Sequence, residues 1–191
     1  MQFGRRLRDS SVALTIVVAA LGGSLPAQAG DAIDGRVLSG WSVYGGTGAS
    51  NAGLFTAGSV NGWLVNGEVR APVLDAPWWL FSPRPTLGFD IATKNDQISD
   101  AYAGFTFTFL KYGDLAFEGQ LGGALHDAKL KNDPSGRDLG CHALFHLGLD
   151  LDWRVTQNWS AQAYASHISN ADLCSENNGY ESAGFRVGYH F

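Results

Sequence analysis

Apolar side chains recur at every second position through much of this 191-residue chain, and this alternation constrains the fold more than any other feature. It is clearest in residues 181–191, where aromatic and aliphatic residues alternate with Gly, Arg and His up to the terminal Phe191. A period of two is typical of β-strands that separate two different environments. Helical periodicity is nearly absent after the first 30 residues. The sequence therefore predicts an all-β protein.

The segments that alternate are separated by two kinds of gap. The gaps near 112–114 and 154–158 are short, whereas those near 126–139 and 170–180 are longer and polar. Short turns at one end and longer loops at the other are typical of outer-membrane barrels, and an even number of strands lets the sheet close. Strands of about ten residues also suit a tilted crossing of a bilayer. We predict an eight-stranded antiparallel transmembrane β-barrel, with strands at roughly 36–46, 55–69, 84–94, 101–111, 115–125, 140–153, 159–169 and 181–191.

The main alternative is a soluble barrel or sandwich, in which the apolar face would point inward. The polar face favours the membrane barrel, because it carries more Asp, Glu, His, Arg, Gln and Thr than a small soluble core could satisfy. In a membrane barrel these side chains fill a narrow lumen. We expect Asp150 and Asp152 to pair there with arginines such as Arg154 or Arg186. The terminal Phe191 also resembles the C-terminal signal of outer-membrane proteins.

Composition and motifs exclude several other classes of protein. Only 16% of the residues are charged and the formal net charge is −5, so no nucleic-acid partner is expected. The chain has no run of about 20 apolar residues beyond its N-terminus, which argues against a helical membrane protein. Two cysteines are too few for a disulfide-rich miniprotein or a four-cysteine zinc site. Because phosphate-loop, nucleotide-binding and zinc motifs are all missing, we expect no cofactor and no metal.

Residues 1–29 have the pattern of a cleaved signal peptide. Three arginines precede an apolar stretch, and Ala27-Gln28-Ala29 matches the small-residue pattern of a cleavage site. We therefore expect residues 30–191 to form the barrel, in the outer membrane of a Gram-negative bacterium. A second apolar segment, Trp78 to Phe81, lies between prolines and indicates an aromatic belt at a membrane interface.

Polar residues interrupt the apolar face of the last two strands near one rim. His167 and Ser169 lie on the same face of their strand as Ala161 and Ala165, because they continue the same alternate positions. Glu181 lies in the same way on the apolar face of the last strand. Polar groups that face hydrocarbon are costly unless they satisfy one another or serve a function. A hydroxyl, an imidazole and a carboxylate can do both, because together they form a nucleophilic triad. The alternative is that all three lie at the headgroup level and are merely hydrated.

The residues around this set resemble a known family. His167-Ile168-Ser169-Asn170, followed by Asn177-Asn178-Gly179 and then Glu181, is similar to the motif of the PagL-type lipid A 3-O-deacylases. The resemblance implies an eight-stranded barrel that hydrolyses an ester-linked acyl chain of lipopolysaccharide in the outer leaflet. It also implies the site residues: Ser169 as nucleophile, His167 as general base, Glu181 as the group that orients the imidazole, Asn170 as an oxyanion donor, and Phe145 as a residue that lines the acyl-chain groove.

Two features depart from that pattern. Ile168 occupies a position that is aromatic in the family, and the chain carries two cysteines, Cys141 and Cys174, near the same rim. The sequence leaves two interpretations of the cysteines, a disulfide that pins the motif-bearing loop or two small unpaired residues. Two other functions also stay open: a catalytically silent structural or adhesion barrel, and a barrel phospholipase or acyltransferase.

Overall fold

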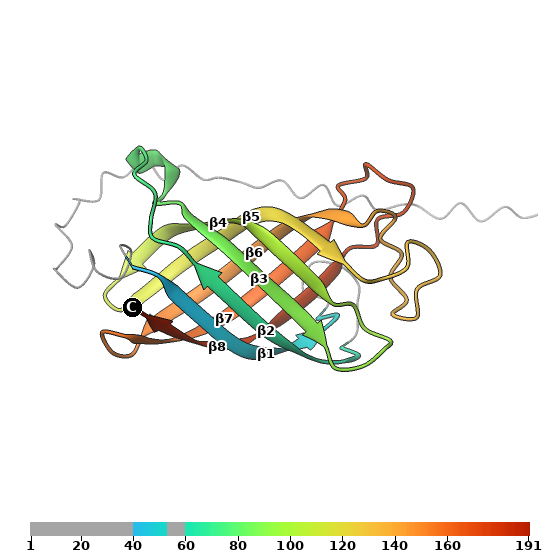
Figure 1. The fold of residues 1–191 in the computed structure, drawn as a ribbon, viewed down its shortest axis with the longest axis horizontal. Helices are drawn as coiled ribbons and strands as arrows, with labels where there is room; N and C mark the ends of the chain where they lie inside the picture. The colour runs from blue at the N-terminus through green and yellow to red at the C-terminus, as the bar shows by residue number, and fades with distance from the viewer. Residues whose placement is uncertain (1–39, 53–59) are drawn as a thin grey trace, which may run out of the picture.

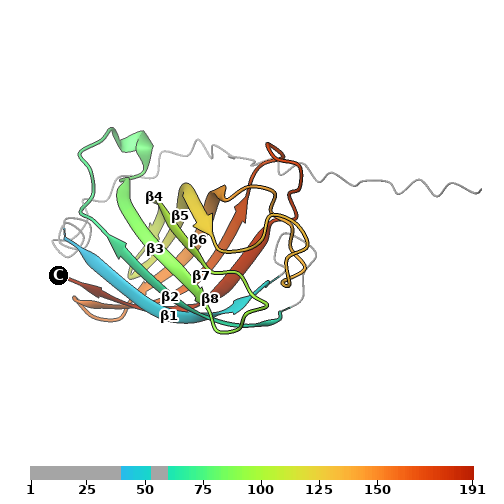
Figure 2. The same cartoon turned by 45° about the vertical axis from the view of Figure 1, so that its right-hand side comes forward.

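The computed structural model describes residues 40–52 and 60–191, which form a closed antiparallel barrel (Figures 1 and 2). Each strand pairs with its neighbours in the sequence, and β1 also pairs with β8, so the sheet has no free edge. The predicted fold and number of strands are confirmed. The expected signal peptide lies outside the described residues. The strands are β1 (Ser42–Ser50), β2 (Gly62–Arg70), β3 (Arg84–Ala92), β4 (Asp100–Tyr112), β5 (Leu115–His126), β6 (Ala143–Arg154), β7 (Trp159–Ser169) and β8 (Tyr180–His190).

The two ends of the barrel differ in their connections. The end that carries the C-terminus, here named the turn end, has two short turns, 113–114 and 155–158 (Figure 1). It also carries a longer segment, 71–83, which contains the single described helix, the 3-10 helix η1 (Trp78–Leu80). The opposite end, here named the loop end, carries the longer connections 127–142 and 170–179. In the part of the chain that the structure describes, no helix has the length and hydropathy needed to cross a membrane.

Inward-facing side chains fill the lumen with a buried ionic network. Arg70 on β2 donates to Glu68 at 2.5 Å, to Glu118 at 2.6 Å and to Asp150 at 2.8 Å. Arg186 on β8 donates to Glu68 and to Asp150, at 2.7 Å in each case. The network therefore joins four strands across the barrel axis. A neighbouring cavity of about 10 Å³ is large enough for no more than about one water molecule, so this part of the lumen is packed and does not form a channel.

The expected ion pairs of the lumen are confirmed for one aspartate and wrong for the other. Asp150 pairs with Arg186, as predicted. Asp152 instead accepts hydrogen bonds from Ser160 at 3.0 Å and from Gln162 at 3.1 Å. The neighbouring strand supplies these donors, because β6 and β7 set Asp152 directly opposite Gln162.

An apolar plug closes the lumen at the loop end. Ile98 and Leu139, which belong to two of the loops, are completely buried, and they pack in one cluster with Ile168 of β7 and Tyr180 of β8. Ile168 points inward between the two predicted site residues of β7. Core packing therefore fixes the end of the strand from which those residues project outward.

The first strand was placed incorrectly by its sequence. We expected it at 36–46, of which 36–39 lie outside the described residues, and β1 spans Ser42–Ser50. Its second half is rich in glycine and shows no alternation, yet it pairs closely with β8. A Cβ atom at Gly46 or Gly48 would collide with the β8 backbone, so the close approach of the two strands requires glycine there. The expected strand 55–69 begins in residues outside the described part, and β2 starts at Gly62.

Candidate active site

The pairing of β7 with β8 places a histidine beside a glutamate on the outward parity of the wall, at the loop end. His167 and Glu181 are direct cross-strand partners, and His167 Nδ1 lies 3.2 Å from Glu181 Oε1. The Glu181 side chain is fully buried, whereas the His167 side chain is 17% exposed. An imidazole that donates from Nδ1 to a carboxylate has Nε2 as its acceptor nitrogen. This pair therefore has the arrangement of a general base and the carboxylate that orients it.

Ser169 ends β7 on the same face as His167. Residues two apart in a strand have Cα atoms about 7 Å from each other and side chains on the same side, within reach of one another. The cross-strand partner of Ser169 is Phe145 of β6, whose ring is 47% exposed on the outer wall. The register between β6 and β7 is unbroken through Ser169. Hence the slip of one residue that would turn Ser169 and His167 inward does not occur.

Asn170 follows Ser169 and is almost completely buried. Its side-chain Nδ2 donates to the carbonyl oxygens of Leu139 and Glu176, at 2.7 and 2.5 Å. Its backbone N–H donates to Asn177 Oδ1 at 3.0 Å. In this structure the donors of Asn170 therefore hold the loop after β7 in place, beside Ser169, the nucleophile that the resemblance predicts.

The loop that follows β7 is fastened to the loop that precedes β6. A disulfide joins Cys141 to Cys174, with Cα atoms 6.1 Å apart, so the structure pairs the two cysteines. The backbone N–H of Asn178 donates to the carbonyl of Asp138 at 3.1 Å, and Lys131 forms an exposed ion pair with Glu176. The covalent bond and the hydrogen bonds together fix the loop segment next to Ser169.

Removing the disulfide is expected to destabilise the barrel. Cys141 and Cys174 are 33 residues apart, and closing a loop of that length stabilises a fold by about 3–4 kcal/mol in the chain-entropy model. We expect the double variant Cys141→Ser/Cys174→Ser to unfold at a lower urea concentration in detergent micelles. Dithiothreitol should shift the wild-type transition toward that of the variant and leave the variant unchanged. Identical transitions for the wild type and the variant would contradict this role.

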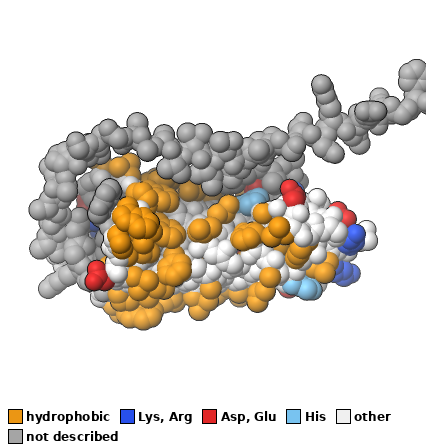
Figure 3. All heavy atoms as spheres, turned by 90° about the horizontal axis from the view of Figure 1, so that it is seen from above, with side chains coloured by type: hydrophobic (Ala, Val, Ile, Leu, Met, Phe, Trp, Pro, Cys, Tyr) orange, Lys and Arg blue, Asp and Glu red, His pale blue; other side chains and the backbone are white. Residues whose placement is uncertain are grey.

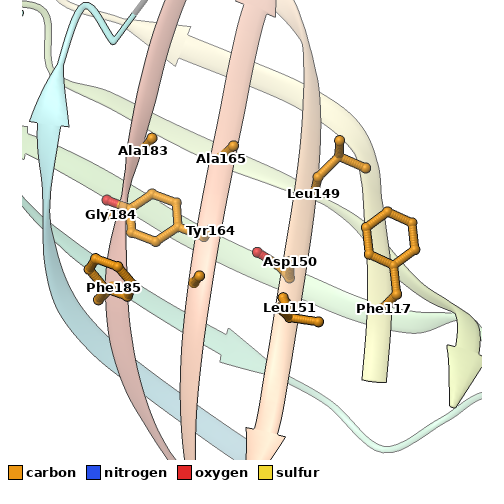
Figure 4. A pocket seen from close by; sticks show the side chains of 10 residues that line it. Phe117, Leu149, Asp150, Leu151, Tyr164, Ala165, Ala183, Gly184 and Phe185 are labelled. Carbon is orange, nitrogen blue, oxygen red and sulfur yellow. The ribbon is translucent and has the colours of Figure 1, made fainter. Parts of the chain in front are cut away.

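An open apolar groove of about 430 Å³ lies on the outside of β5 to β8. It begins at the next outward-facing pair of residues from His167–Glu181, on the side toward the turn end. Ala165 and Ala183, the next outward cross-strand pair toward the turn end, lie on its floor. Leu149 and Phe117 line one side and Phe185 lies on the other (Figure 4). The volume falls in the range of small-molecule sites, and the lining suits a hydrocarbon chain.

The disulfide that fastens the loop is one of the two interpretations that the sequence left open. The resemblance implied an acyl-chain groove lined by Phe145, but Phe145 is not among the residues that line this groove, and the sequence did not identify the residues that do. The signal for the groove was present, because alanines occupy the outward parity of β7 where larger apolar residues occupy that of β6. Small residues beside large ones produce a groove only when the register sets them side by side, and the sequence does not show that register. Among the partners of Asn170, Asn177 belongs to the sequence motif, whereas the two backbone carbonyls have no sequence signal of their own.

Comparison with known proteins points to one family. The family model described as "Lipid A 3-O-deacylase (PagL)" matches residues 58–190. The crystal structure of the outer-membrane enzyme PagL superposes with a TM-score of 0.56, at 19% identity, over 77% of this chain and 97% of that chain. The N-terminal β-barrel domain of Pseudomonas aeruginosa OprF gives 0.54, at 15% identity, over 80% and 98%. At these identities the two structures support the fold alone. Among curated protein sequences, none matches this chain.

Proposed function

The chain belongs to the PagL family of lipid A 3-O-deacylases, and from this premise we propose that it removes the 3-O-linked acyl chain of lipid A by serine-ester hydrolysis. The observation that supports this most directly is the His167–Glu181 pair on the outer wall, with Ser169 on the same face of β7. An outward-facing nucleophile can reach an ester in the surrounding lipid without removing the substrate from the membrane.

The proposed reaction has two stages. Ser169 Oγ attacks the ester carbonyl carbon while His167 Nε2 takes the hydroxyl proton, and Glu181 remains ionised and stabilises the imidazolium. Collapse of the tetrahedral intermediate breaks the bond to the sugar oxygen, which receives the proton from His167. A water molecule then attacks the acyl-enzyme with His167 again as base. This second stage releases a 3-hydroxy fatty acid and restores the serine.

The intermediate also needs hydrogen-bond donors for its negative oxygen. Asn170 is our candidate because it adjoins Ser169. Since its amide protons already bind the carbonyls of Leu139 and Glu176, and its backbone N–H binds Asn177, the oxyanion must replace one of these acceptors. Asn170 would then act both as a fastener of the loop and as a donor to the reaction.

The position of the site suits an acyl chain in the outer leaflet of the outer membrane. The triad lies at the loop end, and the groove extends from it toward the turn end along the outer wall. A lipid A molecule with its sugars at the loop end could lower one acyl chain into this groove, past Phe145. The membrane location is part of the proposal and agrees with the apolar outer wall of the barrel.

The proposed reaction is tested with purified, refolded protein and lipopolysaccharide in mixed micelles. Mass spectrometry should show lipid A that has lost one 3-hydroxyacyl chain, together with the free 3-hydroxy fatty acid. A parallel sample receives phospholipid instead of lipopolysaccharide. Fatty acid released only from phospholipid would identify a phospholipase, and no release from either lipid would identify a catalytically silent barrel.

Filling the groove should impair the reaction. We expect Ala165→Phe to lower kcat/KM for lipopolysaccharide by at least about tenfold, because the added ring occupies the groove floor directly below His167. Ala101→Phe is the matched control, since Ala101 also faces outward but lies on β4, away from the groove. Equal activity of the two variants would show that the groove does not bind the acyl chain.

A further inference from the structure

The connection between β2 and β3 is unusual for the turn end of the barrel. This segment, residues 71–83, is named the hook here, and it is much longer than the turns 113–114 and 155–158. It contains Val, two Leu, two Trp and Phe but only one charged residue, Asp75. Short polar turns are typical at this end of outer-membrane barrels. The apolar composition of the hook therefore needs a separate explanation.

The hook has a fixed shape. Its backbone is tied at the base, where Leu74 N–H donates to the carbonyl of Pro83 at 2.9 Å, and to β4, where Thr108 N–H donates to the carbonyl of Phe81 at 2.9 Å. Phe81 and Ser82 both have a φ near +50°, a conformation that side-chain-bearing residues rarely adopt. Two consecutive residues of this kind turn the chain sharply, and the hydrogen bonds hold the turn.

The hook folds back against the outside of the barrel. The ring of Phe81 packs edge-on against Phe109 of β4, with centroids 5.3 Å apart, and Phe109 in turn contacts the outward-facing Phe117 of β5. The apolar surface of the hook is therefore continuous with the outer wall. Its large apolar side chains include three that are exposed among those the structure describes: Trp79 at 57%, Leu74 at 46% and Phe81 at 44%. Figure 3 looks onto this side and shows hydrophobic side chains gathered at that end of the barrel.

The hook also fills a gap in a ring of aromatic residues. Exposed aromatic side chains encircle most of the turn end, but β2 and β3 carry none there, since their last outward-parity residues at that end are Val69 and Pro85. The hook, which connects these two strands, carries the exposed aromatic residues Trp79 and Phe81. Tryptophan and other aromatic residues in such a ring prefer the boundary between headgroups and acyl chains. The other members of the ring are Trp41, Tyr112, Trp153, Trp159 and Phe191.

We propose that the hook inserts into the bilayer surface at the turn end, where Trp79, Phe81 and Leu74 contact the headgroup–acyl boundary of the inner leaflet. The inference rests on the proposed membrane location of the barrel and not on its proposed chemistry. The hook lies beside β2 to β4, on the side of the barrel opposite β7. It also lies at the turn end, whereas His167 lies at the loop end. It therefore anchors the protein to one leaflet while the candidate active site faces the other.

The test uses a fluorescent probe sensitive to its surroundings at single positions of the full barrel. Trp79→Cys and, separately, Leu74→Cys are labelled with such a probe, which is possible because the two native cysteines are joined in the disulfide. Leu87→Cys on the outer face of β3 is the lipid-facing control, and Gln157→Cys in a short turn is the aqueous control. Each protein is reconstituted into phosphatidylethanolamine–phosphatidylglycerol vesicles with a nitroxide quencher on the upper acyl chain.

We expect the probe at position 79 to lose a fraction of its fluorescence similar to that at position 87 and several-fold larger than that at position 157. Position 74 should follow position 79. Quenching at 79 and 74 as weak as at 157, with free access to aqueous iodide, would overturn the proposal. The same weak quenching would be seen if the hook binds another protein and not the bilayer, because the vesicles contain no other protein. Heat-modifiable migration on gels checks that each variant is folded, and deacylase activity is not used as a readout.

Discussion

Ser169→Ala is expected to lower the rate of fatty-acid release from lipopolysaccharide by about three to six orders of magnitude. Removing the nucleophile of a triad removes the covalent route altogether, and only the weak catalysis by substrate positioning and oxyanion stabilisation remains. The variant should still bind lipid, because the groove below His167 is unchanged. The measurement is the appearance of free 3-hydroxy fatty acid by mass spectrometry, over hours rather than minutes.

The matched control for this prediction is Ser166→Ala. Ser166 lies on the same strand, three residues earlier, but it faces the lumen, where its hydroxyl lies 2.7 Å from that of Ser182. Losing this hydrogen bond should cost about 1 kcal/mol of stability and leave activity near that of the wild type. Full activity in a folded Ser169→Ala variant would refute the serine mechanism, while leaving the barrel and the family assignment intact.

Arg70→Leu should destabilise the barrel more than any other single substitution considered for this protein. Arg70 is fully buried and donates to three carboxylates, those of Glu68, Glu118 and Asp150. Its removal leaves these acidic groups facing one another, and Arg186 pairs with Glu68 and Asp150 but not with Glu118 among the described ion pairs. Breaking a buried ion pair by deleting one partner typically costs about 3–5 kcal/mol, because the remaining charge is uncompensated. We expect a large downward shift of the urea midpoint in detergent micelles, or failure to refold.

Lys131→Ala provides the comparison that separates burial from charge. Lys131 also forms an ion pair, with Glu176 at 3.1 Å, but its side chain is 57% exposed and the pair is hydrated. Exposed pairs of this kind contribute about 0–1 kcal/mol, so this variant should unfold close to the wild type. If the shift for Lys131→Ala equalled that for Arg70→Leu, the lumen network would not be the source of stability that we infer.

Strict alternation made the second half of the barrel predictable. The strand at 159–169 agrees with β7, and that at 181–191 agrees with β8 to within one residue at each end, because a residue on the wrong parity would face the wrong environment. The end of the first strand was placed four residues too early because glycines carry no side chain to alternate. Glycine is required there because β1 and β8 approach each other closely. These two strands lie at opposite ends of the sequence, so the sequence alone does not show that contact.

The sequence predicted the candidate site only in part, as it did the strands. Parity along β7 was enough to place His167 and Ser169 on one face, and parity along β8 was enough for Glu181, because each argument uses one strand at a time. The distance between His167 and Glu181, the groove and the clamp on Asn170 required the register between strands and the path of the loops.

In the strands that alternate, the sequence by itself determined which residues face outward. It also determined how many strands form the barrel and which side chains could form the triad, since all of these follow from a period of two along the chain. Only the tertiary structure decided which side chains meet across the barrel. Arg70 reaches Asp150 from the far side of the lumen, and the hook reaches Phe109 on the next hairpin. Such contacts depend on the stagger of a closed sheet and on loop packing, which involve residues that are distant in the chain.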